Sequence, residues 1–241
     1  MGDDAAEATG WTRHRMGRRA FLISGVGAGL TLPLLGATSA WAQPAGVPPG
    51  GQLAFKVMRK GVHIGEHALT FTQDGDNLSV HTEVRITIKV GPVPVYHYVH
   101  RCTERWTGAR FTNLESSTSA NGVSRESIKA RRTSDGIYIE PAVGDPYTAS
   151  ADCLPLTHWN RLAYQGAPLF NPQDGKLLHE TAKSLGADTI NLADGRPLAA
   201  TRYSLTGESK IDDWYDEQGV WAALRGTVKD GSVLDYRRVD T

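Results

Sequence analysis

In one segment of the chain, hydrophobic and polar side chains alternate strictly over thirteen residues. In LSVHTEVRITIKV, Leu78 to Val90, every second position is aliphatic or Thr, and the positions between them are polar or charged. A period of two predicts a β-strand with one buried and one solvated face. At about 3.3 Å per residue the strand would be about 43 Å long, whereas most strands have about 3–10 residues. Its buried face covers either a packed core or a space that receives a ligand.

Turn signals recur about every ten residues along most of the chain. Many are Asn-Gly or Asp-Gly pairs, which favour hairpins because Gly accepts the positive φ of a tight turn. The segments between them predict strands at 52–60, 63–73, 78–90, 95–107, 110–119, 123–133, 137–143, 176–185, 187–192, 197–206, 209–217, 220–229 and 232–239. We therefore expect an all-β fold, an antiparallel meander curled into an open or closed barrel.

One stretch interrupts the alternation. Residues 154–165, LPLTHWNRLAYQ, show no period of two. We expect a short helical segment near 155–165 with Thr157 as its N-cap, because a threonine hydroxyl can accept a hydrogen bond from a free backbone N–H of the first turn. Such a segment would plug or cover one end of the curled sheet.

The alternation also predicts polar side chains on the inner face, where an unpaired charge is costly. In one interpretation Arg59 and Glu104 are structural and lie near strand ends or pair with each other. In a second, they orient the polar group of a mostly apolar ligand, and a third is catalysis by the same set. The candidate ligand-binding residues are Arg59, His67, Val84, Ile86, Tyr96, Tyr98, His100, Glu104 and Trp106.

The N-terminal residues predict an export signal. Arg18 and Arg19 precede an apolar stretch that is too short and too rich in Gly for a good membrane span, and Ala40 and Ala42 form a small-x-small cleavage pattern. The sequence RRAFL resembles a twin-arginine motif. We therefore expect the twin-arginine translocase and signal peptidase as partners during export, cleavage after Ala42 and a periplasmic location. Met16 is an alternative translation start.

These features divide the chain into a signal at 1–42, a Pro- and Gly-rich linker at 43–51 and a single β domain at 52–241. Without the signal, 22 Lys and Arg stand against 23 Asp and Glu, and this balance argues against nucleic acid as a partner. Cys102 and Cys153 are the only cysteines. They can form a disulfide in an oxidising compartment, or they are two small buried hydrophobic side chains.

The chain contains no complete catalytic motif: a zinc-protease helix, a nucleophile elbow, a P-loop and a dinucleotide fingerprint are all missing. His63 and His67 share a strand face about 13 Å apart, too far for one metal ion to join them directly. Cys153 and His158 would suit a thiol nucleophile and its base, but no orienting carboxylate or oxyanion hole can be identified. We expect no catalytic residue, metal or cofactor.

An acidic cluster with aromatic neighbours occupies residues 212–217, DDWYDE. Clustered carboxylates can bind calcium, and a pair of them can divide the acid and base roles in glycoside hydrolysis. The interpretation that we prefer is a hairpin turn at Asp216-Glu217-Gln218-Gly219, with Trp214 and Trp221 packing across the pair of strands.

Five stretches are distinctive as a set: FKVMRKGVHIGEH (55–67), GPVPVYHY (91–98), CTERW (102–106), THWN (157–160) and DDWYD (212–216). Together they resemble a family of exported bacterial proteins, mainly alphaproteobacterial, that is classified only as a domain of unknown function. The resemblance covers nearly all of the β domain and implies a secreted, β-rich protein without an assigned activity. A weaker, architectural likeness is to the open barrels of periplasmic lipoprotein carriers, and fold does not imply function.

The sequence favours a periplasmic binding protein over an enzyme. We expect a lipid or another hydrophobic small molecule to lie in the curved sheet, with Arg59 or Glu104 fixing its polarity. The wall would be formed by Leu78, Val80, Val84, Ile86 and Ile88, with aromatic contacts from Tyr96, Tyr98 and Trp106. One alternative is a periplasmic hydrolase that uses the acidic cluster or the histidines. Another is a purely structural envelope protein with a filled core.

Overall fold

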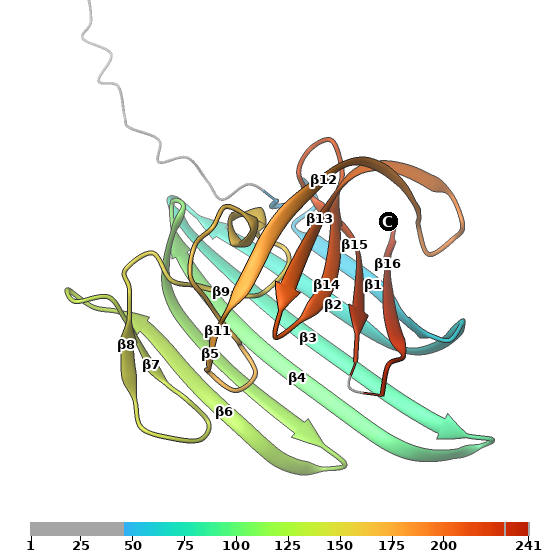
Figure 1. Cartoon of the computed structure of the whole chain (residues 1–241), viewed down its shortest axis with the longest axis horizontal. Coiled ribbons are helices and arrows are strands. Elements are labelled where there is room, and N and C mark those ends of the chain that lie inside the picture. The colour runs from blue at the N-terminus through green and yellow to red at the C-terminus, as the bar shows by residue number, and fades with distance from the viewer. Residues whose placement is uncertain (1–45, 229, 241) are drawn as a thin grey trace, which may run out of the picture. The chain divides into compact units, whose positions relative to one another are not determined.

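A computed structural model describes residues 46–228 and 230–240, with side chains except at 124–126. The predicted export signal and the start of the linker lie outside these residues. Within them, the main sheet has thirteen strands (Figure 1). They are β1 (Gln52–Arg59), β2 (Val62–Asp74), β3 (Asn77–Val90), β4 (Val93–Thr107), β5 (Arg110–Ala120), β6 (Val123–Arg132), β7 (Ile137–Glu140), β8 (Tyr147–Ala149), β12 (Glu180–Asn191), β13 (Pro197–Gly207), β14 (Lys210–Tyr215), β15 (Trp221–Thr227) and β16 (Val233–Val239).

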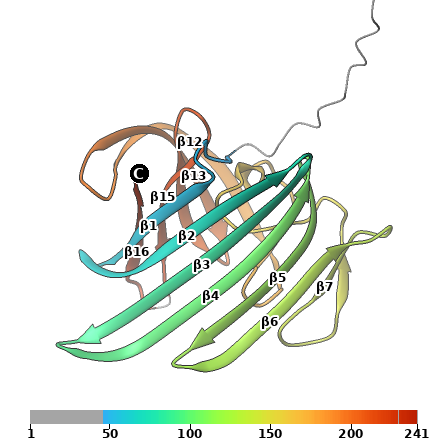
Figure 2. The same cartoon turned by 180° about the vertical axis from the view of Figure 1, so that it is seen from behind.

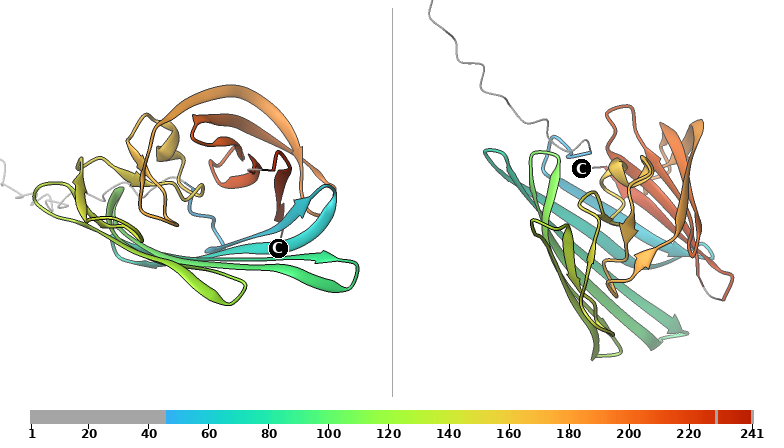
Figure 3. Two further views of the ribbon diagram at one scale, coloured as in Figure 1. Left: turned by 60° about the horizontal axis from the view of Figure 1, so that its bottom comes forward. Right: turned by 60° about the vertical axis from the view of Figure 1, so that its left-hand side comes forward.

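The strands form one antiparallel meander in the order β12-β13-β14-β15-β16-β1-β2-β3-β4-β5-β6-β7-β8. The last strand, β16, pairs with the first, β1. The C-terminal half therefore continues the N-terminal half, and β12 and β8 are the two edges. The sheet curls so that β12 to β16 lie opposite β3 to β5 without closing (Figures 2 and 3). The predicted all-β fold and antiparallel meander are confirmed, and the barrel is open.

The segment that connects the two edges crosses inside the curl. It contains β9 (Leu154–Pro155), the 3-10 helix η1 (Arg161–Tyr164), β10 (Leu169–Phe170) and β11 (Leu177–Leu178), and its three strands form a small sheet. Trp159 packs edge-on against Trp106, with ring centroids 5.6 Å apart, and Phe170 packs against Phe111 at 6.0 Å. The expected plug is therefore present, because these aromatic rings belong to the core of the large sheet.

The helical part of this segment is shorter than expected. It has four residues, and its N-cap is Asn160, whose side-chain oxygen accepts a hydrogen bond from the backbone N–H of Leu162 at 3.0 Å. The expectation that Thr157 caps the helix is wrong. Asn is at least as good an N-cap as Thr, and the short strand β9 already ends at Pro155.

Two further differences concern strands. The segments expected at 176–185 and 187–192 are instead the short strand β11 and one continuous strand, β12, whose register shifts between Ser184 and Gly186. A β-bulge adds one residue and breaks the alternation, so the pattern looked like two strands. Strand β8 was not expected, and β7 ends at Glu140. In the part of the chain that is described, no helix is long and apolar enough to cross a membrane.

The long alternating segment forms β3 as predicted, and its apolar side faces inward. Val80 is fully buried, and Val84 and Ile86 are 7% and 8% exposed. Cys102 and Cys153 are both buried free thiols. This corresponds to the alternative of two small hydrophobic side chains rather than to a disulfide.

Candidate functional site

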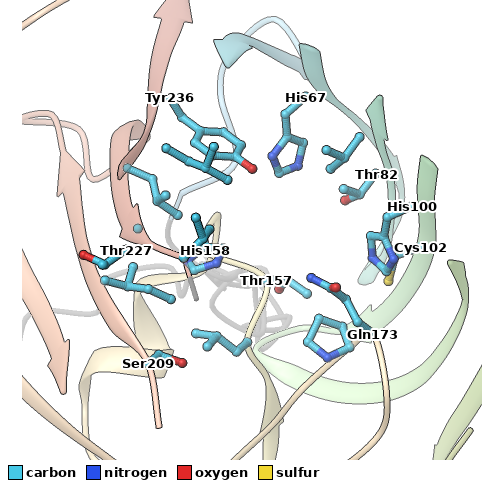
Figure 4. Close-up of a pocket in the computed structure, with 18 of the residues that line it drawn as sticks. His67, Thr82, His100, Cys102, Thr157, His158, Gln173, Ser209, Thr227 and Tyr236 are labelled. Carbon is cyan, nitrogen blue, oxygen red and sulfur yellow. The ribbon is translucent and has the colours of Figure 1, made fainter. Parts of the chain in front are cut away.

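A cavity of about 330 Å³ lies inside the curl, between β2 to β4, the crossing segment and β14 to β16 (Figure 4). Its wall combines aliphatic side chains with an unusual number of polar ones. The residues that line it include His67, Thr82, Val84, Tyr98, His100, Cys102, Leu156, Thr157, His158, Gln173, Ser209, Ile211, Leu224, Leu234 and Tyr236.

The register of the sheet brings the polar residues together. His67 on β2 lies opposite Val84 on β3, which lies opposite His100 on β4. In the next row Thr82 lies opposite Cys102. Because cross-strand partners point to the same face of a sheet, residues that are far apart in sequence form one side of the cavity.

A second cavity of about 480 Å³ adjoins the first and is mainly aliphatic and aromatic. The two share Tyr98, Gln173, Val228, Leu234 and Tyr236. The second cavity also contacts Ile64, Ile86, Ile88 and Tyr96, with Arg59 and Asp230 beside them. Together they form a pocket with a polar inner part and an apolar outer part, of the size that proteins use for small-molecule ligands, about 300–1,000 Å³.

His67 is the most unusual group in the inner cavity. It is 6% exposed, it has no hydrogen-bond partner at either ring nitrogen, and its ring contacts those of Phe55, Trp221 and Tyr236. Burial, with smaller contributions from the neighbouring His158 and His100, lowers its pKa from 6.5 to about 3. His67 is therefore neutral at ordinary pH. The buried hydroxyl of Thr82 also lacks a partner, although buried polar groups are nearly always hydrogen-bonded.

His100 is held more firmly. Its Nδ1 forms a hydrogen bond of 2.9 Å with the hydroxyl of Thr118, and burial lowers its pKa from 6.5 to about 4. The two histidines on this wall are therefore uncharged, and they offer ring nitrogens rather than positive charge. This part of the wall suits a neutral hydrogen-bonding group better than an anion.

On the opposite side, His158 is fixed by a fully buried carboxylate, Asp213. The Nδ1 of His158 donates to Oδ2 of Asp213 at 2.8 Å, and the indole of Trp221 donates to Oδ1 at 2.8 Å. The hydroxyl of Tyr164 also donates to Asp213, and the hydroxyl of Tyr215 donates to the carbonyl of His158 at 2.6 Å. His158 has a φ of 59°, a conformation that is rare outside glycine. These contacts hold His158 in this backbone conformation. Its Nδ1 is hydrogen-bonded to Asp213, and its Nε2 is not bonded to that carboxylate.

Glu104 and Trp106 do not line either cavity. Glu104 is fully buried beneath the wall and accepts the indole N–H groups of Trp106 at 3.1 Å and of Trp159 at 2.9 Å. Burial raises its pKa from 4.5 to about 7. The proposed pairing of Arg59 with Glu104 is wrong, because Arg59 forms an ion pair with Asp230 and donates to Ser232 at 2.8 Å.

The acidic cluster is dispersed by folding. Asp212 pairs with Arg202 at 2.6 Å, and Asp216 pairs with Arg238 at 2.8 Å. Asp216 also accepts the backbone N–H of Val220 within the turn, which agrees with a hairpin. Trp214 and Trp221 belong to separate core clusters, so they do not pack across the hairpin as expected. Among the described residues, no three His, Cys, Asp or Glu side chains form a group that could hold a metal ion.

The candidate residues from the sequence thus divide into three groups. His67, Val84, His100 and Tyr98 line the inner cavity; Arg59, Ile86, Tyr96 and again Tyr98 line the outer one; Glu104 and Trp106 lie in the core. The lining residues that were missed include Thr82, Gln173, Leu234 and Tyr236. Thr82 lies on the predicted inner face of the alternating strand, so its place in the cavity wall could have been predicted from the sequence. The other three reach the cavity only through the crossing segment and the pairing of β16 with β1.

Comparison with known proteins supports the fold. The chain is similar to a solved structure from Brucella abortus, described as a beta-barrel-like protein of domain of unknown function DUF1849. The two share 7% identity over 84% of this chain and 98% of that chain, with a TM-score of 0.58, so the likeness concerns architecture alone. No curated protein matches. The model of the family "Domain of unknown function (DUF6134)" matches residues 55–239, and the chain therefore belongs to the DUF6134 family.

Proposed function

We propose that this chain is an exported protein that binds a lipid or another hydrophobic small molecule inside its curled sheet. The observation that carries the proposal is the pocket itself. Its outer part is formed by Ile64, Ile86, Ile88 and Leu234, and its inner part ends at His67 and Thr82, whose polar atoms have no partner. An apolar chain in the outer part would gain about 25 cal/mol for each Å² of apolar surface removed from water.

The inner part adds a preference for the polar group of the ligand. A ligand oxygen or hydroxyl near His67 and Thr82 would supply the hydrogen bonds that these groups lack, and an unmade bond of this kind costs about 1–3 kcal/mol. Because His67 and His100 are neutral, a neutral polar group such as an alcohol or an ester carbonyl fits better than a carboxylate. Two cationic side chains line the pocket in the described part of the chain: Arg59 is paired with Asp230, and Lys210 lines the inner part together with Glu208.

The test is direct binding. Native mass spectrometry of gently purified protein should detect a retained lipid or uptake of added oleyl alcohol, and the dye N-phenylnaphthylamine should become fluorescent on binding and be displaced by that alcohol. Val84→Trp should fill the inner cavity and abolish the dye signal. Arg85→Trp, one residue along β3 on the exposed face, is the matched control and should leave the signal intact. No retained lipid and no dye binding by the wild-type protein would reject the proposal.

A second candidate function, hydrolysis of such a ligand, is favoured by one specific observation. Asp213 orients His158 through Nδ1, so Nε2 can accept a proton from a water molecule that attacks an ester carbonyl. His67 and Thr82 are available as donors to the oxygen of that carbonyl. Hydrolysis of p-nitrophenyl acyl esters by the wild-type protein should then disappear in His158→Gln while dye binding is kept. Equal ester turnover in both proteins, or none in either, leaves binding as the function.

A further inference from the structure

The meander gives the sheet two very different ends. Because consecutive strands are antiparallel, the turns β15–β16, β1–β2, β3–β4 and β5–β6 all lie at one end. The pairing of Arg59 with Leu234, and of Val90 with Val93, locates these turns. The other end carries the turns β2–β3, β4–β5, β6–β7 and β14–β15, whose sequences are DGDN, TGAR, TSDG and DEQG. That end is polar.

The first end carries exposed valines at each of these four turns, whereas the β13–β14 turn at the same end has none. We call the following seven residues the valine edge: Val62, Val90, Val93, Val95, Val123, Val228 and Val233. Their exposure ranges from 36% at Val228 to 68% at Val90. Only three other large hydrophobic residues are exposed in the described part of the chain, and one of them, Val143, lies in the β7–β8 turn at the same end. Exposed apolar side chains gathered in this way mark an interaction surface.

The composition of the valine edge indicates which kind of surface it meets. Protein interfaces are enriched in aromatic residues and arginine and depleted in lysine, whereas this edge is aliphatic and has lysines beside its valines. Lys60 lies in the β1–β2 turn and Lys89 is the last residue but one of β3. Both are exposed and neither forms an ion pair with a described residue, although the hydrogen bonds from Ser232 and, to a smaller extent, the charge of Lys60 lower the pKa of Asp230. Apolar side chains flanked by lysine are suited to the interface of an anionic lipid bilayer, where each lysine contributes about 1 kcal/mol.

The valine edge also lies beside the outer cavity. Val228 belongs both to the edge and to the wall of that cavity, and Ile88 and Arg59 line the cavity next to the β3–β4 and β1–β2 turns. A protein resting on this edge would therefore hold the apolar outer part of its pocket close to the lipid surface.

We propose that the valine edge docks on a bilayer that contains anionic lipid, so that the protein collects or delivers its ligand there. The role in ligand transfer rests on the function proposed above, but docking does not, since it can be measured without any ligand. The valines enter the apolar boundary of the bilayer, and Lys60 and Lys89 lie against its phosphate groups.

Binding to vesicles tests this directly. Full-length protein is mixed with vesicles of phosphatidylethanolamine and phosphatidylglycerol, or with phosphatidylcholine vesicles, and sedimented. The double variant Val90→Asp/Val93→Asp should bind at least about tenfold more weakly, because each valine contributes about 1.5–3 kcal/mol when fully buried and about half of that when it enters the bilayer partly. Lys60→Gln and Lys89→Gln should each cost about fivefold, and only with the anionic vesicles. Leu185→Asp, an exposed leucine on β12 away from this end, is the matched control and should bind like wild type.

A fluorescent probe at the valine edge gives a second readout. It reports contact of this edge with the bilayer and does not respond when another part of the chain binds the vesicle instead. Bimane attached at Val93→Cys should shift to shorter emission wavelengths on addition of anionic vesicles, while bimane at Leu185→Cys should not. The native cysteines are buried and should not be labelled. No shift at Val93→Cys, or equal vesicle binding by wild type and the double valine variant, overturns the proposal.

Two outcomes separate docking from ligand binding. If vesicle binding depends on the valines but the dye N-phenylnaphthylamine does not bind, docking holds and the proposed function fails. If the double variant turns a dimer into a monomer and neither vesicle type binds wild type, the edge is a contact between two copies of the chain and docking is wrong.

Discussion

Replacing Glu104 with glutamine should change how the stability of the protein depends on pH. The carboxylate is fully buried, and each of its oxygens accepts an indole N–H, Oε2 from Trp106 and Oε1 from Trp159. Burial raises its pKa from 4.5 to about 7, although these hydrogen bonds lower it. In the unfolded chain the same carboxyl has its ordinary pKa.

The sign of the effect follows from proton binding. Between pH 4.5 and about 7 the folded protein holds a proton at Glu104 that the unfolded chain has released. The free energy of unfolding must therefore fall as the pH rises through this range. Each tenfold difference in proton affinity is worth about 1.4 kcal/mol. The contribution of Glu104 is therefore complete below pH 4.5 and has decreased by about 3 kcal/mol once the pH exceeds 7.

Urea unfolding followed by tryptophan fluorescence, repeated from about pH 4 to about pH 8, measures this for wild type and for Glu104→Gln. Glutamine does not titrate, and a hydrogen bond lost with the substitution gives the same offset at every pH. The difference, wild type minus variant, should therefore fall by about 3 kcal/mol with rising pH. A difference that stays constant to within about 1 kcal/mol, or that rises with pH, would refute the reasoning that burial controls this carboxyl.

Two further predictions concern other buried groups, two histidines and two cysteines. The pKa values of His67 and His100 are about 3 and about 4 in the folded protein because of burial, so the unfolded chain binds more protons below pH 6.5 and stability should fall as the pH falls. In His67→Phe the decrease in the free energy of unfolding on acidification should be smaller by about 5 kcal/mol near pH 3. If urea unfolding shows the same decrease at low pH in wild type and variant, the burial of a neutral His67 is contradicted. Burial also raises the pKa of the Cys102 thiol well above its usual range and that of Cys153 to about 12. Ellman's reagent should therefore label neither thiol in native protein and both after unfolding, and fast labelling at neutral pH without denaturant would show that one of them is accessible.

The sequence alone was sufficient for the long strands of the N-terminal half and for which of their faces is buried. The period of two in residues 78–90 located β3 and correctly placed Val84, Ile86 and Thr82 inside, because side-chain alternation is a local property of an extended backbone. The Asn-Gly and Asp-Gly pairs located the β2–β3, β5–β6, β6–β7, β12–β13 and β15–β16 hairpins for the same reason, since a tight turn depends on the φ values of adjacent residues. Local rules failed where the chain is irregular, at the bulge of β12 and at the cap of η1.

The tertiary structure decided which inward residues surround a pocket and which belong to the core. His67 and Glu104 look alike in the pattern, yet His67 lines the cavity without a partner, while Glu104 lies beneath the wall between two indoles. That difference depends on Trp159, which is 55 residues from Glu104 in the sequence and is brought to it by the crossing segment. The contact between His158 and Asp213 spans the same separation. Such contacts depend on how the sheet curls around its connecting segment. Alternation along one strand holds no information about which distant residues this curling brings into contact.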